Sequence, residues 1–188
     1  MGEFGAIHKG DLTDRQLCAF WEQVRAAGKG RSIGYDCPPF GPAGFAQWMR
    51  QPDVEAWIVL FRGEPCGLLY LNGILGKTAH GHFTVTSMGT ARVGTPIGRL
   101  PGLKAFGMYC MGSVLWNRDA NGLYTLDTVI GVLPACNDAA VRLVRSTPVG
   151  MEVGVVPGAA YFYDERENVP ALVTAYTREN VPRWCAAL

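Results

Sequence analysis

The segment that most constrains the fold lies between Tyr124 and Gly154, where the pattern is strand, helix, strand. Its first part, TLDTVIGVL, is rich in β-branched residues and ends at Pro134, which is typical of a strand. Residues 137–145 then carry apolar side chains at helical spacing, and Gly150 precedes a further strand. A β-α-β unit set among antiparallel strands requires a mixed sheet with helices on both faces.

The rest of the chain supplies those antiparallel strands. Residues 55–62, 67–71 and 78–87 are three consecutive strands on short turns, which predicts a meander. The remaining expected elements are strands at 6–9, 153–163 and 171–177, and helices at 14–27, 45–50 and 103–114. We therefore expect a single α/β domain over residues 1–188, with a mixed, mostly antiparallel sheet between its helices.

Charge and hydropathy exclude several classes of protein. Lys and Arg number 17 against 16 Asp and Glu, so no net field attracts nucleic acid or an anionic membrane. The longest apolar run, 56–61, is too short to span a bilayer, and the N-terminal residues lack the apolar segment of a signal peptide. These features predict a cytoplasmic protein, and both a monomer and a homodimer remain open.

The six cysteines are scattered singly, without a C-x-x-C pair or a histidine at ligand spacing. No metal site is therefore expected. Buried, reduced thiols that pack as small apolar groups explain most of them.

A short motif lies at the junction of the strand and helix in the 124–154 segment. Asn137, Ala140 and Leu143 form the pattern Asn-x-x-Ala-x-x-Leu. This pattern, with the order of elements, resembles the GNAT superfamily of acyl-CoA N-acyltransferases. The resemblance implies acetyl-CoA or another acyl-CoA as cofactor, a primary amine of a small molecule or protein as acceptor, and Asn137 and Ala140 beside the pantetheine arm. Asn137 as a helix cap alone is the alternative.

The resemblance also implies a V-shaped cleft for pantetheine, formed because strand 128–133 splays away from the 84–87 end of its neighbour. Pyrophosphate would then bind in the Gly-rich residues 88–99, where glycines expose backbone N–H groups and arginine offers a fork to phosphate. Ordinary turns also use these residue types, the spacing differs from the family motif, and Pro101 follows closely. The expected cofactor contacts in this loop are Arg92, Val93, Gly94, Thr95 and Gly98. The resemblance also implies cofactor contacts at Ser87, Met88 and Gly89, where a backbone N–H would be the oxyanion partner of the tetrahedral intermediate.

Acyl transfer to an amine requires a base for the amine and an acid for the departing thiolate. The family places a tyrosine acid at the position that here is Val144, which donates no proton. Cys136, Ser146 and Tyr109 are candidate substitutes. His82 shares a strand face with His80 and is a candidate base, or else a hydrogen-bonded structural residue.

Other polar residues are candidates for contacts with the acceptor. Asp127 could orient a histidine or anchor a cationic acceptor, although a solvated or capping carboxylate explains it as well. Residues 28–44 form an unusually long Gly- and Pro-rich loop, typical of a functional segment. The acceptor candidates are Arg31, Tyr35 and Asp36 in this loop and Tyr161, Tyr163 and Tyr176 in the last hairpin, where cross-strand packing is the alternative.

Three functions remain open from the sequence. The first is an acyl-CoA-dependent N-acyltransferase. The second is a GNAT-like protein without catalysis that binds CoA or serves a structural role, as in phage-related proteins of this kind. The third is an unrelated α/β enzyme that uses Cys136 or another cysteine with a histidine.

Overall fold

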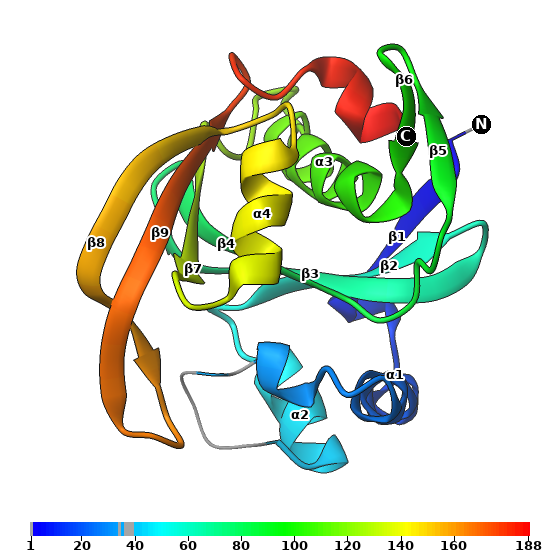
Figure 1. Ribbon diagram of the computed structural model, residues 1–188. Helices are drawn as coiled ribbons and strands as arrows, with labels where there is room; N and C mark the ends of the chain where they lie inside the picture. The colour runs from blue at the N-terminus through cyan, green and yellow to red at the C-terminus, as the bar shows by residue number, and fades with distance from the viewer. Residues whose placement is uncertain (1, 34, 36–39) are drawn as a thin grey trace.

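A seven-stranded sheet with the order β1-β2-β3-β4-β7-β9-β8 forms the centre of the protein (Figure 1). The computed structural model describes residues 2–33, 35 and 40–188. Neighbouring strands are antiparallel, except that β4 and β7 are parallel. The strands are β1 (Phe4–His8), β2 (Glu55–Phe61), β3 (Glu64–Leu75), β4 (Thr78–Val85), β7 (Thr128–Pro134), β8 (Met151–Phe162) and β9 (Glu167–Thr177). The expected mixed, mostly antiparallel sheet is confirmed.

Helices cover both faces of this sheet, as Figure 1 shows. On one face lie α1 (Asp14–Ala26) and α2 (Pro42–Met49), and on the other α3 (Gly102–Leu115) and α4 (Asp138–Ser146). Alternate residues of β3 enter the two cores: Leu68 and Tyr70 pack with α1 and α2, whereas Leu69 and Leu71 pack with α3. No helix of the described residues has the length and apolar character needed to cross a bilayer.

The start of α1 follows directly from its sequence. Thr13 Oγ1 accepts a hydrogen bond from the backbone N–H of Gln16, and the Gln16 side chain accepts one from the Thr13 backbone. This reciprocal capping satisfies two N–H groups that a helix start leaves without partners.

The Gly-rich residues 88–99 are not an irregular loop, which corrects the expectation. They contain β5 (Arg92–Thr95), which pairs with β6 (Gly98–Pro101) in a two-stranded hairpin. The Thr95 hydroxyl donates to the Gly98 carbonyl (2.7 Å), and Gly98 adopts a φ of 111°, a region that glycine tolerates best. Val93 is buried in the core and anchors the hairpin. Pro101 is the residue before α3, so it does not kink the helix.

The parallel pairing of β4 with β7 is short. It joins Thr78–His80 to Thr128–Ile130 and ends there, while β7 stays paired with β9 as far as Pro134. At the point of separation Gly81 leaves room for Val129, because a Cβ at Gly81 would lie 2.3 Å from Val129 Cγ1. Beyond this point the two strands part. The expected splay of 128–133 from the 84–87 end of β4 is confirmed.

Candidate active site

A cleft of about 800 Å³ occupies the space where β4 and β7 separate. Its walls are the inner edges of the two strands, residues 81–86 and 131–134, together with α4 and the segment after α1. The backbone edges of both strands therefore face the cleft instead of each other. Other lining residues are Lys29, Arg31, Ser32, Tyr35, Met88, Gly89, Leu103, Met111, Asn137, Ala139, Ala140, Leu143, Val144, Phe162, Asp164, Glu165, Thr174 and Tyr176.

Asn137 and Ala140 lie together at the start of α4, on the wall of the cleft. Asn137 Oδ1 accepts a hydrogen bond from the Ala140 backbone N–H (3.2 Å), so the expected capping role is confirmed. Because both residues also line the cleft, the cap places polar groups beside the edge of β7.

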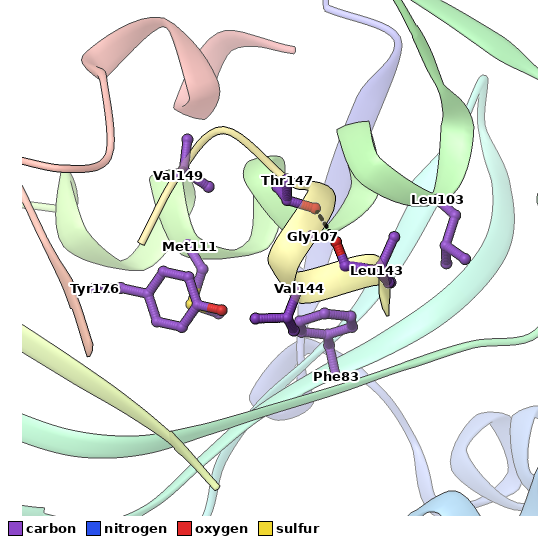
Figure 2. A pocket seen from close by; sticks show the side chains of 9 residues that line it. All are labelled: Phe83, Leu103, Gly107, Met111, Leu143, Val144, Thr147, Val149 and Tyr176. Atoms are coloured by element: carbon purple, nitrogen blue, oxygen red, sulfur yellow. Dashed lines mark hydrogen bonds between the residues drawn. The ribbon is translucent and has the colours of Figure 1, made fainter. Parts of the chain in front are cut away.

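A small void of about 10 Å³ adjoins the cleft beneath α4 (Figure 2). It has room for roughly one water molecule. Phe83, Leu143, Val144 and Tyr176 line both the void and the cleft, so the void is the inner end of the same space. Figure 2 shows the Tyr176 hydroxyl pointing toward Val144. The surroundings of this hydroxyl are mostly apolar.

His82 lies on the wall of the cleft that faces α1 and α2. Its ring stacks on Tyr70 (centroids 4.5 Å apart, planes 6° apart), and its Nε2 lies 3.1 Å from Asn72 Oδ1. An amide oxygen only accepts, so Nε2 donates this hydrogen bond. The structure thus holds His82 in one orientation at the cleft wall. Its role as a base stays a prediction.

The segment after α1 and the β8–β9 turn meet over the outer end of the cleft. Arg31 forms an ion pair with Asp164 (2.9 Å) and donates to the Tyr35 carbonyl (3.3 Å). The Tyr163 backbone N–H also donates to that carbonyl (2.8 Å), and the rings of Tyr35 and Phe162 are in edge contact. Arg31 and Tyr35 thus line the cleft, and their contact with an acceptor stays a prediction. Asp36 is outside the described residues.

The aromatic residues expected from the last hairpin need a correction. Tyr161 and Tyr163 share the exposed face of β8 and its turn, and neither lines the cleft. Phe162 between them does. Successive side chains of a strand point to opposite faces, so Tyr161 and Tyr163 share a face that points away from the cleft. Tyr176 on β9 does line the cleft.

Asp127 does not lie at the cleft either, which corrects its expected catalytic role. It precedes β7, at the end opposite to Asn137, and its carboxylate accepts a hydrogen bond from Arg178 (2.5 Å). Arg178 also lies over the Tyr124 ring and donates to the Leu126 carbonyl. The hydrogen bond from Arg178 lowers the pKa of the Asp127 carboxyl below its ordinary value. Asp127 therefore acts as a partner of Arg178.

No described cysteine is placed for nucleophilic chemistry with a histidine. Cys136 is exposed in the turn before α4 and is outside the cleft lining. Burial raises the pKa of the Cys66 thiol to about 12 and of the Cys185 thiol to about 11, which disfavours the reactive thiolate. Within the described part of the chain, no group of three His, Cys, Asp or Glu side chains could hold a metal.

The other substitutes for the missing acid are also displaced from the cleft. Tyr109 is buried on α3, where it stacks on Phe4 and where burial raises its pKa to about 12. The Ser146 hydroxyl donates to the Leu143 carbonyl (3.0 Å). Neither residue lines the cleft.

The residues expected to contact the cofactor divide into two groups. Met88, Gly89, Asn137 and Ala140 line the cleft. Ser87 and the hairpin residues Arg92, Val93, Gly94, Thr95 and Gly98 do not. The sequence predicted an open loop here, whereas β5 pairs with β6 in a hairpin. This pairing places the residues of the second group away from the cleft wall.

We expect the replacement Asp127→Asn to lower the melting temperature at neutral pH without changing the cleft. The native carboxyl has a lowered pKa, so its contribution is present above the unfolded pKa of about 3.9 and is lost as the pH falls through the native value. Thermal unfolding between pH 7 and pH 3 should show the difference from wild type shrinking in acid. Asp53→Asn, at another exposed carboxyl, is the control, and a difference independent of pH would contradict the assignment.

The fold matches those of several solved structures over nearly the whole length of the chain. A spermidine N-acetyltransferase from Vibrio cholerae, solved with CoA and spermine, has a TM-score of 0.65 at 10% identity, covering 95% of this chain and 98% of that one. An acetyltransferase from Salmonella typhimurium that modifies the N-terminal serine of ribosomal protein L7/L12 has 0.65 at 10%, covering 93% and 95%. The ribosomal-protein-S5-alanine acetyltransferase from Vibrio fischeri has 0.62 at 10%, covering 96% of each.

Sequence comparisons give no such match: no family model and no curated protein matches the chain. The similarity is therefore one of architecture. The chain has the GNAT acyl-CoA N-acyltransferase fold.

Proposed function

We propose that the protein is an acyl-CoA-dependent N-acyltransferase that binds CoA in the cleft between β4 and β7 and transfers the acyl group to a primary amine. The observation that carries this proposal is the end of the β4–β7 pairing after His80 and Ile130. The separation leaves two backbone edges facing a cleft of about 800 Å³. Small-molecule sites are typically roughly 300–1,000 Å³ in volume.

The walls of the cleft fit the pantetheine arm. Pantetheine carries amide groups, which need hydrogen-bond partners when they leave water. The inner edges of residues 81–86 and 131–134 offer backbone N–H and C=O groups of the same kind. Asn137 and Ala140, at the start of α4, would lie along the same arm.

The pyrophosphate would bind at the beginning of α3. Met88 and Gly89 line the cleft there, and so does Leu103 in the first turn of α3. Pro101 precedes this helix and makes no side-chain cap, and a helix start presents N–H groups that favour an anion. Gly89 adopts a φ of 48°, which lets the chain bend at this place.

Bound acyl-CoA would supply a thioester, whose carbonyl carbon an amine can attack. His82 would take the proton from the amine, because it lines the cleft and an imidazole is a common general base. Asn72 and Tyr70 would keep the ring oriented during this step. The amine would enter from the side of Ser32 and Tyr35, which also line the cleft.

The outer end of the cleft favours a polar acceptor. Asp164 and Glu165 line it, together with Lys29 and Arg31. Arg31 is paired with Asp164, so Glu165 is the carboxylate that would attract the cation of an amine substrate. A small amine or a protein amine would both fit this description. A cytoplasmic location would give access to acyl-CoA.

CoA binding without catalysis is the second candidate function. Val144 favours it, because α4 offers no proton donor at the position where the family uses tyrosine. An acyltransferase would turn over acyl-CoA and a CoA-binding protein would not, whereas both would bind CoA.

Arg92→Ala should leave CoA binding unchanged. A charge-assisted contact with phosphate is worth about 1.5–3 kcal/mol, so its loss weakens binding roughly tenfold to a hundredfold. Arg92 lies on the β5–β6 hairpin and not on the cleft wall, so we expect less than about a twofold change in the Kd measured by calorimetry. A tenfold loss would show that the hairpin holds the pyrophosphate.

The proposed activity predicts release of free CoA from acetyl-CoA in the presence of an amine. The panel should contain polyamines, amino acids and peptides, with thiol release as the readout. His82→Ala should lower kcat about a hundredfold, the usual effect of losing a positioned base. His80→Ala is the matched control, because His80 is on the same strand face but outside the cleft lining.

Three outcomes are informative. Turnover that falls in His82→Ala and persists in His80→Ala supports the enzyme with His82 as base. Turnover that is equal in all three proteins removes His82 from the mechanism. CoA binding without turnover on any amine would favour the second candidate function.

A further inference from the structure

The inner end of the cleft contains a hydroxyl group that could replace the missing proton donor of α4. Among the described residues that line the small void beneath α4, hydroxyl groups belong to Thr147 and Tyr176 (Figure 2). Thr147 Oγ1 donates to the Leu143 carbonyl (2.7 Å), which ties it to the helix. The Tyr176 hydroxyl points toward Val144, the residue at the family's acid position.

The Tyr176 ring is fixed by two glycines. A Cβ at Gly150 would lie 2.4 Å from Tyr176 Cε1, and a Cβ at Gly131 would lie 3.5 Å from Cε2. Gly150 also adopts a φ of 85°, so a larger residue there would be strained as well as in collision with the ring. The ring therefore occupies space that exists because residue 150 has no side chain.

The hydroxyl remains protonated at neutral pH. Tyr176 is 8% exposed, and burial raises the pKa of its hydroxyl above the ordinary value, while a hydrogen bond with Thr174 acts in the opposite direction to a smaller extent. An acid must hold its proton until the leaving group needs it. Thr174 is itself buried and lines the cleft.

We propose that Tyr176 is the general acid of acyl transfer, delivering from β9 the proton that α4 does not provide. This inference rests on the proposed function. As the N–C bond forms, the C–S bond breaks with its electron pair on sulfur, and Tyr176 Oη gives its proton to that sulfur. The phenolate then takes up the proton that the amine has lost, through water. Atoms and charges balance, and the products are the amide and free CoA.

The experiment compares wild type with Tyr176→Phe, which removes the hydroxyl and keeps the ring between the glycines. We expect kcat for acetyl transfer to fall about a hundredfold, because a positioned acid contributes about that much or more. The Kd for CoA and the melting temperature should stay as in wild type. Tyr109→Phe is the matched control, a buried tyrosine outside the cleft, and should keep full kcat.

A rescue variant separates an acid from a structural tyrosine. Val144 also lines the large cleft, so Val144→Tyr brings a hydroxyl into the cleft from α4, and the double variant Tyr176→Phe with Val144→Tyr should regain at least about tenfold in kcat over Tyr176→Phe. If Tyr176 had only a structural role, a hydroxyl at position 144 of α4 would not restore kcat.

The experiments test the proposed function and the role of Tyr176 separately. Wild-type turnover tests the proposed function, and its absence alongside CoA binding would overturn both that function and the acid. If wild type turns over, an unchanged kcat in Tyr176→Phe would overturn the inference alone. A loss of kcat that parallels a loss of CoA affinity or stability would also overturn it, because the tyrosine would then act by packing.

Discussion

The structure depends on the place where β4 and β7 stop pairing. Three residues on each strand form the parallel contact, and from Gly81 and Gly131 onward the strands diverge. A parallel pair that continued would bury its backbone groups in mutual hydrogen bonds. Where the strands separate, these backbone groups face the cleft, while the opposite edges of β4 and β7 stay paired with β3 and β9. The cleft therefore exists without any loss of pairing on the other side of either strand.

The elements around the cleft give it two distinct ends. The inner end, under α4, is apolar and contains Tyr176 between two glycines. The outer end is polar and is bounded by the Arg31–Asp164 ion pair. His82 lies on the wall that faces α1 and α2. A thioester that approaches from the α4 side and an amine that approaches from the other would meet between these groups.

Much of the fold was predictable because it depends on local patterns. The β-branched run before Pro134, the cap at Asn137 and the capping box of α1 are each encoded within a few residues. The hairpin of β5 and β6 was missed because glycine and threonine serve turns and strands alike, and because Val93 of β5 is buried in a core made of residues distant in the sequence. That burial is a tertiary effect that a local pattern does not contain.

The site was predicted less completely than the fold. Asn137, Ala140 and His82 line the cleft as expected, but Asp127 is bound to Arg178, and Phe162 replaces its two tyrosine neighbours. The face that a strand turns inward depends on register with its partner, which is set by residues far away in sequence. The close approach of Tyr176 to Gly150 joins β9 to the residue before β8, and a single sequence gives no sign of it.

The central claim is that CoA occupies the cleft between β4 and β7. Calorimetric titration of CoA into Ala140→Trp tests it most directly, because this change puts an indole into the cleft from the first turn of α4. Asp138→Trp, on the same helix but outside the cleft lining, is the control for bulk and folding. We predict at least about a tenfold loss of affinity in Ala140→Trp and little change in the control. Equal affinity of both variants and wild type for CoA would contradict the account.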